Sequence, residues 1–178
     1  MCIRDSANTG QSTIGHFEYS TSTLSGNVSM PNGVGIQFVK VAATGPSVAD
    51  TVETDASGNY SFPNIRNNES VVLNLSREGK STNGLSVSDF IAVRKDLLVI
   101  ETLSPEQKFA ADVNENGTVS ISDYIDLIEV ILIIEPDFEL GPWRFFENNI
   151  SLLMNGDVVK DVTVVKRGDV NFNANPTE

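Results

Sequence analysis

Residues 112–123 read Asp-Val-Asn-Glu-Asn-Gly-Thr-Val-Ser-Ile-Ser-Asp, and the segments on both sides are best interpreted from this stretch. Oxygen-bearing side chains stand at positions 1, 3, 5 and 12, and the glycine at position 6 permits a sharp bend of the backbone. Calcium is a hard cation that takes six to eight oxygen ligands, and loops with this spacing supply them. The alternative is an Asn- and Gly-rich turn without metal. The spacing predicts a Ca²⁺ site with these ligand residues: Asp112, Asn114, Asn116, Thr118 through its carbonyl oxygen, and Asp123.

A weaker copy of the second half of this pattern lies 34 residues earlier, where residues 85–91 (Leu-Ser-Val-Ser-Asp-Phe-Ile) parallel residues 119–125 (Val-Ser-Ile-Ser-Asp-Tyr-Ile). Apolar residues follow Asp89 and Asp123 at helical spacing, so each aspartate is expected in the first turn of a helix, where a negative charge suits the helix dipole. We therefore predict a duplicated pair of loop–helix units. Counting back from Asp89 places Glu78, Lys80 and Thr82 at positions 1, 3 and 5 of the upstream loop.

A lysine at position 3 opposes a cation, so one metal in the helix pair is the better prediction. Residues 169–173 read Asp-Val-Asn-Phe-Asn and match the start of a calcium loop, but no position 12 follows them. The sequence leaves open whether the upstream loop or residues 169–173 bind metal.

The segments flanking the helix pair have the pattern of β-strands. Alternating residues at 35–41 and 71–75 are separated by turn signals at 31–33, 44–46 and 57–59, which indicates a small antiparallel β-sandwich. After Pro136 the pattern is again β. The predicted fold class is α+β multidomain, with a polar lead-in at 1–21, the β-sandwich at 22–77, the helix pair at 78–137 and a β-rich tail at 138–178.

Composition limits the possible functions. The 178-residue chain has a formal net charge of −12, which argues against binding to nucleic acid or to anionic membrane surfaces. The sequence has no run of 18 apolar residues, so it does not predict a membrane-spanning helix. The chain has one cysteine, Cys2, and one histidine, His16, and no catalytic pair stands out, so we predict that it is not an enzyme.

Two stretches resemble known families. Residues 24–28, 32–36 and 54–62 resemble carboxypeptidase-regulatory-like and SdrD-B-like sandwich repeats, which implies a scaffold in a secreted protein with Tyr60 and Phe62 in its core. Residues 81–136 resemble the type I dockerin repeat, which implies calcium-dependent docking onto a cohesin domain. The basic pair Arg94 and Lys95 matches the position that faces cohesin in that family.

The order of the pieces is similar to the dockerin-like regions of secreted surface proteins of Bacteroidetes. It includes the segments 83–89, 110–114, 143–145 and 168–171. By contrast, residues 1–6 resemble a translated sequencing adapter, so Met1 and Cys2 are expected to be artefacts.

Together these observations predict a non-catalytic, calcium-binding module of a bacterial surface or extracellular protein. Its expected partner is a cohesin-like domain or a neighbouring domain of the same chain. The alternatives are the attachment module of an upstream polysaccharide-degrading enzyme, or a carbohydrate-binding module that stacks sugar on Trp143.

Overall fold

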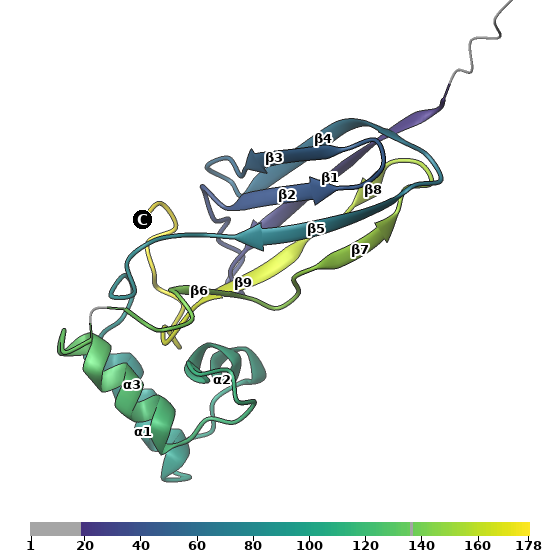
Figure 1. Cartoon of the computed structure of the whole chain (residues 1–178). Helices are drawn as coiled ribbons and strands as arrows, with labels where there is room; N and C mark the ends of the chain where they lie inside the picture. The colour runs from purple at the N-terminus through teal and green to yellow at the C-terminus, as the bar shows by residue number, and fades with distance from the viewer. Residues whose placement is uncertain (1–18, 136) are drawn as a thin grey trace, which may run out of the picture.

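The computed structural model describes residues 19–135 and 137–178. The adapter-like residues 1–6 and His16 lie outside this part. Two β-sheets form one end of the molecule, and three helices form the other (Figure 1). The elements in chain order are β1 (Thr21–Ser29), β2 (Lys40–Thr44), β3 (Ala49–Glu53), β4 (Asn59–Arg66), β5 (Ser70–Ser76), α1 (Val87–Leu97), α2 (Pro105–Ala111), α3 (Ile121–Ile131), β6 (Trp143–Phe145), β7 (Ile150–Leu153), β8 (Val158–Val159) and β9 (Val162–Lys166).

The sandwich is built from strands on both sides of the helices. One sheet has the order β4-β1-β9-β6, with β8 also paired to β1, and the other has the order β3-β2-β5-β7. The structure therefore differs from the prediction of a self-contained sandwich at 22–77 followed by a separate β-rich tail at 138–178. The tail supplies one edge strand to the second sheet and three strands to the first. The helical segment is an insertion between two halves of one sandwich.

The prediction of an antiparallel sandwich is also wrong in one detail. Strand β1 pairs in parallel with β8 and with β9, whereas the other strand pairs are antiparallel. Parallel neighbours require a long crossover between them. Here the helices lie in the connection from β1 to β8 and β9, so the helical insertion is part of the crossover that the parallel pairing requires.

The core of the sandwich follows the alternation of its strands. Tyr60 and Phe62 of β4 are 4% and 2% exposed, in line with the expectation for these aromatics. The predicted strand at 35–41 instead bends at Phe38, which has a φ of 62° and is 50% exposed. This bend shifts the buried set to Ile36 and Val39, so β2 begins only at Lys40.

Helices α1 and α3 match the helical half of the predicted duplication, since each has 11 residues and begins after a serine. The rings of Phe90 and Tyr124, which are equivalent residues of the two copies, stack with their centroids 4.5 Å apart. A second hydrophobic core lies between the helices and includes Val93, Leu127 and, from the C-terminal segment, Val170. Within the described residues, no helix is both long and apolar enough to cross a membrane.

Candidate functional site

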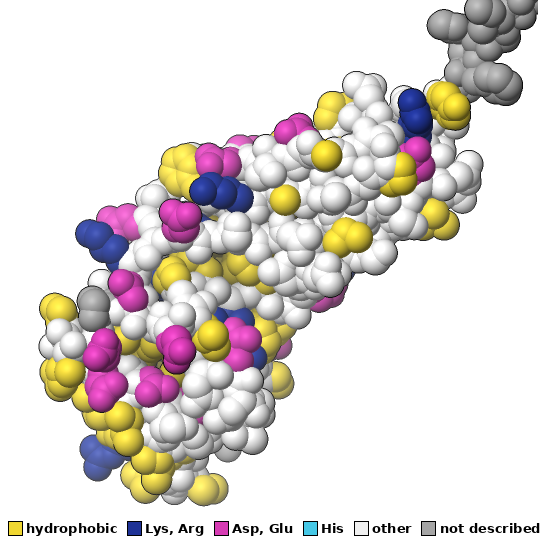
Figure 2. Space-filling view, viewed as in Figure 1, with side chains coloured by type: hydrophobic (Ala, Val, Ile, Leu, Met, Phe, Trp, Pro, Cys, Tyr) yellow, Lys and Arg dark blue, Asp and Glu magenta, His cyan; other side chains and the backbone are white. Residues whose placement is uncertain are grey.

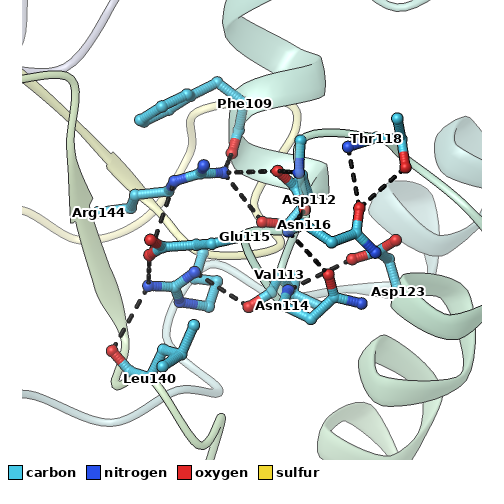
Figure 3. A network of polar contacts seen from close by, with 12 residues as sticks. Phe109, Asp112, Val113, Asn114, Glu115, Asn116, Thr118, Asp123, Leu140 and Arg144 are labelled. Carbon is cyan, nitrogen blue, oxygen red and sulfur yellow. Dashed lines mark hydrogen bonds and ion pairs between the residues drawn. The ribbon is translucent and has the colours of Figure 1, made fainter.

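The loop at 112–123 is curled by hydrogen bonds between its own side chains and backbone. The carboxylate of Asp112 accepts N–H groups from Asn116 at 3.0 Å and Gly117 at 3.1 Å. Asn114 Oδ1 accepts the Asn116 N–H at 3.1 Å, and Asn116 Oδ1 accepts the Thr118 N–H at 2.9 Å. The side chains at positions 1, 3 and 5 are therefore fixed by hydrogen bonds from backbone N–H groups of the same loop (Figure 3).

Asp123 brings the two ends of this loop together. Its Oδ1 accepts the N–H of Asn114 at 3.3 Å, while Oδ2 accepts both the N–H and the hydroxyl of Ser120 at 2.9 Å. A further bond joins Asn114 Nδ2 to the hydroxyl of Ser122 at 3.0 Å. The start of α3 is thus attached to the first turn of the loop, which is the closure expected of position 12.

The donor set fits a calcium ion. Asp112 and Asp123 are 5% and 1% exposed, and two carboxylates buried at the two ends of one loop favour a cation there. The oxygens come from two carboxylates, two amides and a backbone carbonyl, all hard ligands. Asp126, one turn along α3, has a raised pKa because of burial and the charges of Asp123 and Glu139. In the described part of the chain, no three His, Cys, Asp or Glu side chains gather around a metal position, so this site depends on its asparagines.

Two arginines of the sandwich hold the loop, and the sequence analysis missed both. Arg144 of β6 donates to the carbonyl of Phe109 at 2.7 Å and lies 3.3 Å from Asp112 Oδ2. Arg167, just after β9, is 1% exposed and donates to the carbonyl of Val113 at 3.0 Å and to Glu115 at 2.7 Å. Only the fold brings these residues to the loop, so no local pattern could have revealed them.

The upstream loop does not resemble a cation site at its own predicted positions. Glu78, Lys80 and Thr82 are exposed, and Glu78 pairs instead with Lys40 of the sandwich at 3.6 Å. Its closing residue, Asp89, is fully buried but accepts N–H groups from Val170 and Asn171.

Apolar side chains gather along the outer side of α1 and α3, with charged side chains beside them (Figure 2). This side carries two hollows whose linings are equivalent in the two copies, with Arg94 in the first where Ile128 stands in the second. Lys95, the other residue of the basic pair, is held by Glu101 at 2.9 Å. We name this surface the α1/α3 face and define it by these residues: Val87, Phe90, Arg94, Leu97, Leu98, Ile121, Tyr124, Ile128, Ile131 and Leu132.

The helical insertion is similar to a known protein family. Residues 85–132 match the family model of the dockerin type I domain. Dockerin domains are non-catalytic modules of extracellular or cell-surface proteins; they bind cohesin domains and typically bind calcium. No curated protein matches the chain. The dockerin match spans α1, α2, the loop and α3, and it leaves the sandwich outside.

Trp143 is not placed to stack on a sugar. Its side chain is 5% exposed, with the guanidinium of Arg77 4.7 Å and the amine of Lys166 5.0 Å from the ring centroid. The buried indole is therefore already engaged by two cation–π contacts. The carbohydrate-binding alternative loses the residue on which it rested.

Proposed function

We propose that this chain is a calcium-dependent docking module of a secreted or cell-surface bacterial protein. The observation that supports the proposal is the dockerin match at 85–132, which includes a loop whose backbone is curled by hydrogen bonds to Asp112. The sandwich has the role of a scaffold, as its resemblance to carboxypeptidase-regulatory-like repeats suggests. The module itself is non-catalytic.

The ligands proposed for Ca²⁺ are Asp112, Asn114, Asn116, Asp123 and the carbonyl oxygen of Thr118. The bound ion supplies positive charge that offsets the repulsion between the two carboxylates. The residues of the chain do the positioning: Asp123 joins the first turn of α3 to Asn114, and Arg144 and Arg167 join the loop to the sandwich. The orientation of α3, and with it the α1/α3 face, thus depends on the loop.

The α1/α3 face is the proposed partner surface. Its exposed side chains include Leu98 at 57% and Leu132 at 63%, which are equivalent residues at the ends of the two helices. A contiguous apolar surface of this kind is characteristic of a protein interface. We propose a cohesin-like domain as its partner, with Arg94 and Lys95 among the polar contacts. A neighbouring domain of the same chain is the second candidate, because the same apolar surface could pack within one polypeptide.

Calcium dependence is tested by thermal melting in EDTA and in millimolar CaCl₂. We expect Ca²⁺ to raise the melting temperature of the wild type, because an ion that binds only the folded state stabilises it. Asp112→Ala should make this increase smaller, because the variant lacks a ligand of the loop site. Asp50→Ala is the matched control, since Asp50 is exposed on β3 and its side chain bonds only to the next residue. No increase in the wild type, or an equal increase in Asp112→Ala, would contradict this proposal.

Docking is tested by pull-down with a cohesin domain in CaCl₂. The double variant Leu98→Ser/Leu132→Ser should lose at least about 10-fold in affinity, as expected when apolar anchors leave an interface. Leu153→Ser is the control, because Leu153 is 63% exposed but lies on β7 of the sandwich. Equal binding by the double variant and the control would exclude the α1/α3 face as the contact surface.

A second candidate function is that of an attachment module for an enzyme. The chain would attach an upstream polysaccharide-degrading enzyme to a scaffold, and the α1/α3 face and the calcium loop would keep their roles. The dockerin match favours it equally, since docking modules carry no chemistry of their own. The sequence of the full-length gene distinguishes the two, because an upstream catalytic domain would support the attachment function.

A further inference from the structure

The segment after β9 lies against the start of α1, although about 80 residues separate them in the chain. Asn83 fastens the segment there: its Oδ1 accepts the N–H of Asn175 and its Nδ2 donates to the carbonyl of Asn175, both at 2.9 Å. Gly84 lies so close that a Cβ on it would be 2.6 Å from the Cα of Ala174. This contact places the C-terminal segment beside the turn that leads into α1.

Residues 169–173 repeat the hydrogen-bond pattern of residues 112–116, while the left-handed backbone of Gly117 (φ of 88°) has no counterpart at Ala174. Asp169 accepts the N–H of the residue four places on, Asn173, at 3.3 Å and that of the next residue, Ala174, at 2.7 Å. Asp112 makes the same two bonds to Asn116 and Gly117. The fourth residue of each segment has a left-handed backbone, with a φ of 56° at Phe172 and 57° at Glu115.

Asp89 closes this arrangement as Asp123 closes the other. The N–H of Asn171 donates to Asp89 Oδ1 at 3.3 Å, as the N–H of Asn114 does to Asp123 Oδ1. Asn171 Nδ2 lies 3.1 Å from the hydroxyl of Ser88, which repeats the 3.0 Å bond from Asn114 to Ser122. Positions 1, 3 and 5 thus come from the C-terminal segment, and position 12 comes from α1.

The charges at this second arrangement are less compensated than at the first. Asp89 and Asp169 are both 0% exposed, and neither belongs to an ion pair among the described residues. By contrast, Asp112 has Arg144 at 3.3 Å. The nearby amine of Lys166 donates instead to the carbonyl of Lys80. Two buried carboxylates outside any ion pair are costly, and a bound cation would offset that cost.

We propose that Asp169, Asn171 and Asn173 of the C-terminal segment join Asp89 of α1 in a second calcium site that is split across the chain. This extends the calcium binding proposed above to residues outside the dockerin match, except Asp89. The contiguous upstream loop has lost its ligands, and the C-terminal segment replaces them. An ion bound here links the segment that follows β9 to the start of α1. It therefore fixes the helix pair on the sandwich.

The proposal is tested by calcium stoichiometry, measured by calorimetry and native mass spectrometry on the whole chain after removal of metal with EDTA. We expect two ions per chain for the wild type and one for Asp169→Asn. Asp112→Ala should also bind one ion, because it keeps the split site, and the double variant Asp112→Ala/Asp169→Asn should bind none, so each loss is assigned to its own site. Asn173→Ala should weaken one site by at least about 10-fold, since affinity follows the ligand set.

Asn173→Ala should leave the fold intact, because Asn173 is exposed and lies at the surface end of the arrangement. A loss of calcium binding in this variant is therefore not explained by misfolding. Asn116→Ala is its counterpart in the loop at 112–123, and Asn74→Ala, at an exposed position on β5, is the control that should retain both ions. Fluorescence of Trp143 gives a second readout, since Arg77 contacts both its ring and the carbonyls of Pro176 and Glu178. One ion in the wild type, or a second ion that survives Asp169→Asn and is lost in Glu78→Gln, would overturn the proposal.

Discussion

At the scale of single residues, two buried cations, Arg167 and Lys166, make polar contacts where the sandwich meets the helices. Arg167 bonds to the carbonyls of Gly141 and Val113 and to Glu115, and its side chain is almost wholly enclosed. Lys166 beside it is also buried and lies over the ring of Trp143. A buried cation is tolerated only when oxygens surround it, so these two residues should be sensitive to substitution.

Arg167→Leu should lower the free energy of unfolding by about 3 kcal/mol, because the change leaves buried carbonyl oxygens without donors. Urea denaturation followed by circular dichroism measures the loss. Arg66→Leu serves as the comparison: Arg66 is exposed and stacks on Tyr19 at 4.3 Å, so its loss should cost less than about 1 kcal/mol. Equal losses in the two variants would contradict the role given to Arg167.

Lys166 should make the stability of the metal-free protein depend on pH. Burial, with Arg77 adding to it, lowers the pKa of Lys166 to about 7 against the attraction of Asp137 and Asp169. Above that pH the unfolded chain keeps a proton that the folded chain has lost, so the free energy of unfolding should rise from pH 7 to about 9.5, by at most about 1.4 kcal/mol per pH unit. Urea titrations in EDTA measure the slope. Lys166→Met should flatten it, and an unchanged slope would argue against this assignment.

At the scale of elements, the helices begin with similar local signals. Each is preceded by a serine, and the third residue of the helix bonds back to that serine: Asp89 in α1, Gln107 in α2 and Asp123 in α3. Helix α2 did not figure in the sequence prediction, although Ser104-Pro105-Glu106-Gln107 is the pattern of a capping box with proline at the first position. Its seven residues are too few for a clear apolar period, which is why the spacing argument missed it.

Ser104→Ala should cost about 1 kcal/mol of stability, because the serine hydroxyl caps the N–H of Gln107 at 3.2 Å. It should also lower calcium affinity slightly, since α2 leads directly into Asp112. Thermal melting and calorimetry measure the two effects. Ser76→Ala, at an exposed end of β5, is the control that should change neither quantity. A melting temperature that matches the control would show that the cap contributes nothing.

At the scale of the whole molecule, the sandwich and the helical insertion depend on each other. Strands β7 and β9 complete the two sheets, and the segment that follows β9 lies against α1. Unfolding of one part therefore exposes the core of the other. The match to the dockerin family ends at residue 132, so the family resemblance alone conceals this dependence.

A fragment of residues 19–77 should not fold, because it lacks the strands that pair with the exposed edges of β1 and β5. For the whole chain, circular dichroism and Trp143 fluorescence should give coincident melting curves, as expected for one cooperative unit. A fragment with a cooperative melting transition of its own, or separate transitions in the whole chain, would show that the two parts fold independently.

The sequence was sufficient for features written in short spacings. The curled loop at 112–117, the closing Asp123 and the paired helices α1 and α3 each depend on residues within a few turns of one another, and the structure has them at the predicted positions. Sequence reasoning could also place Asp89 and residues 169–173 in fragments of one pattern. It could not join them, because nothing local records that the chain returns to α1 after β9.

Only the tertiary structure decided how the flanking β segments combine and which residues enclose the loop. The contacts of Arg144, Arg167 and Asp169 join positions that lie far apart in the chain, and such contacts follow from sheet topology and shared cores. Burial then sets their energetics: a carboxylate such as Asp89 is ordinary at an exposed helix start but calls for a cation once two segments close over it.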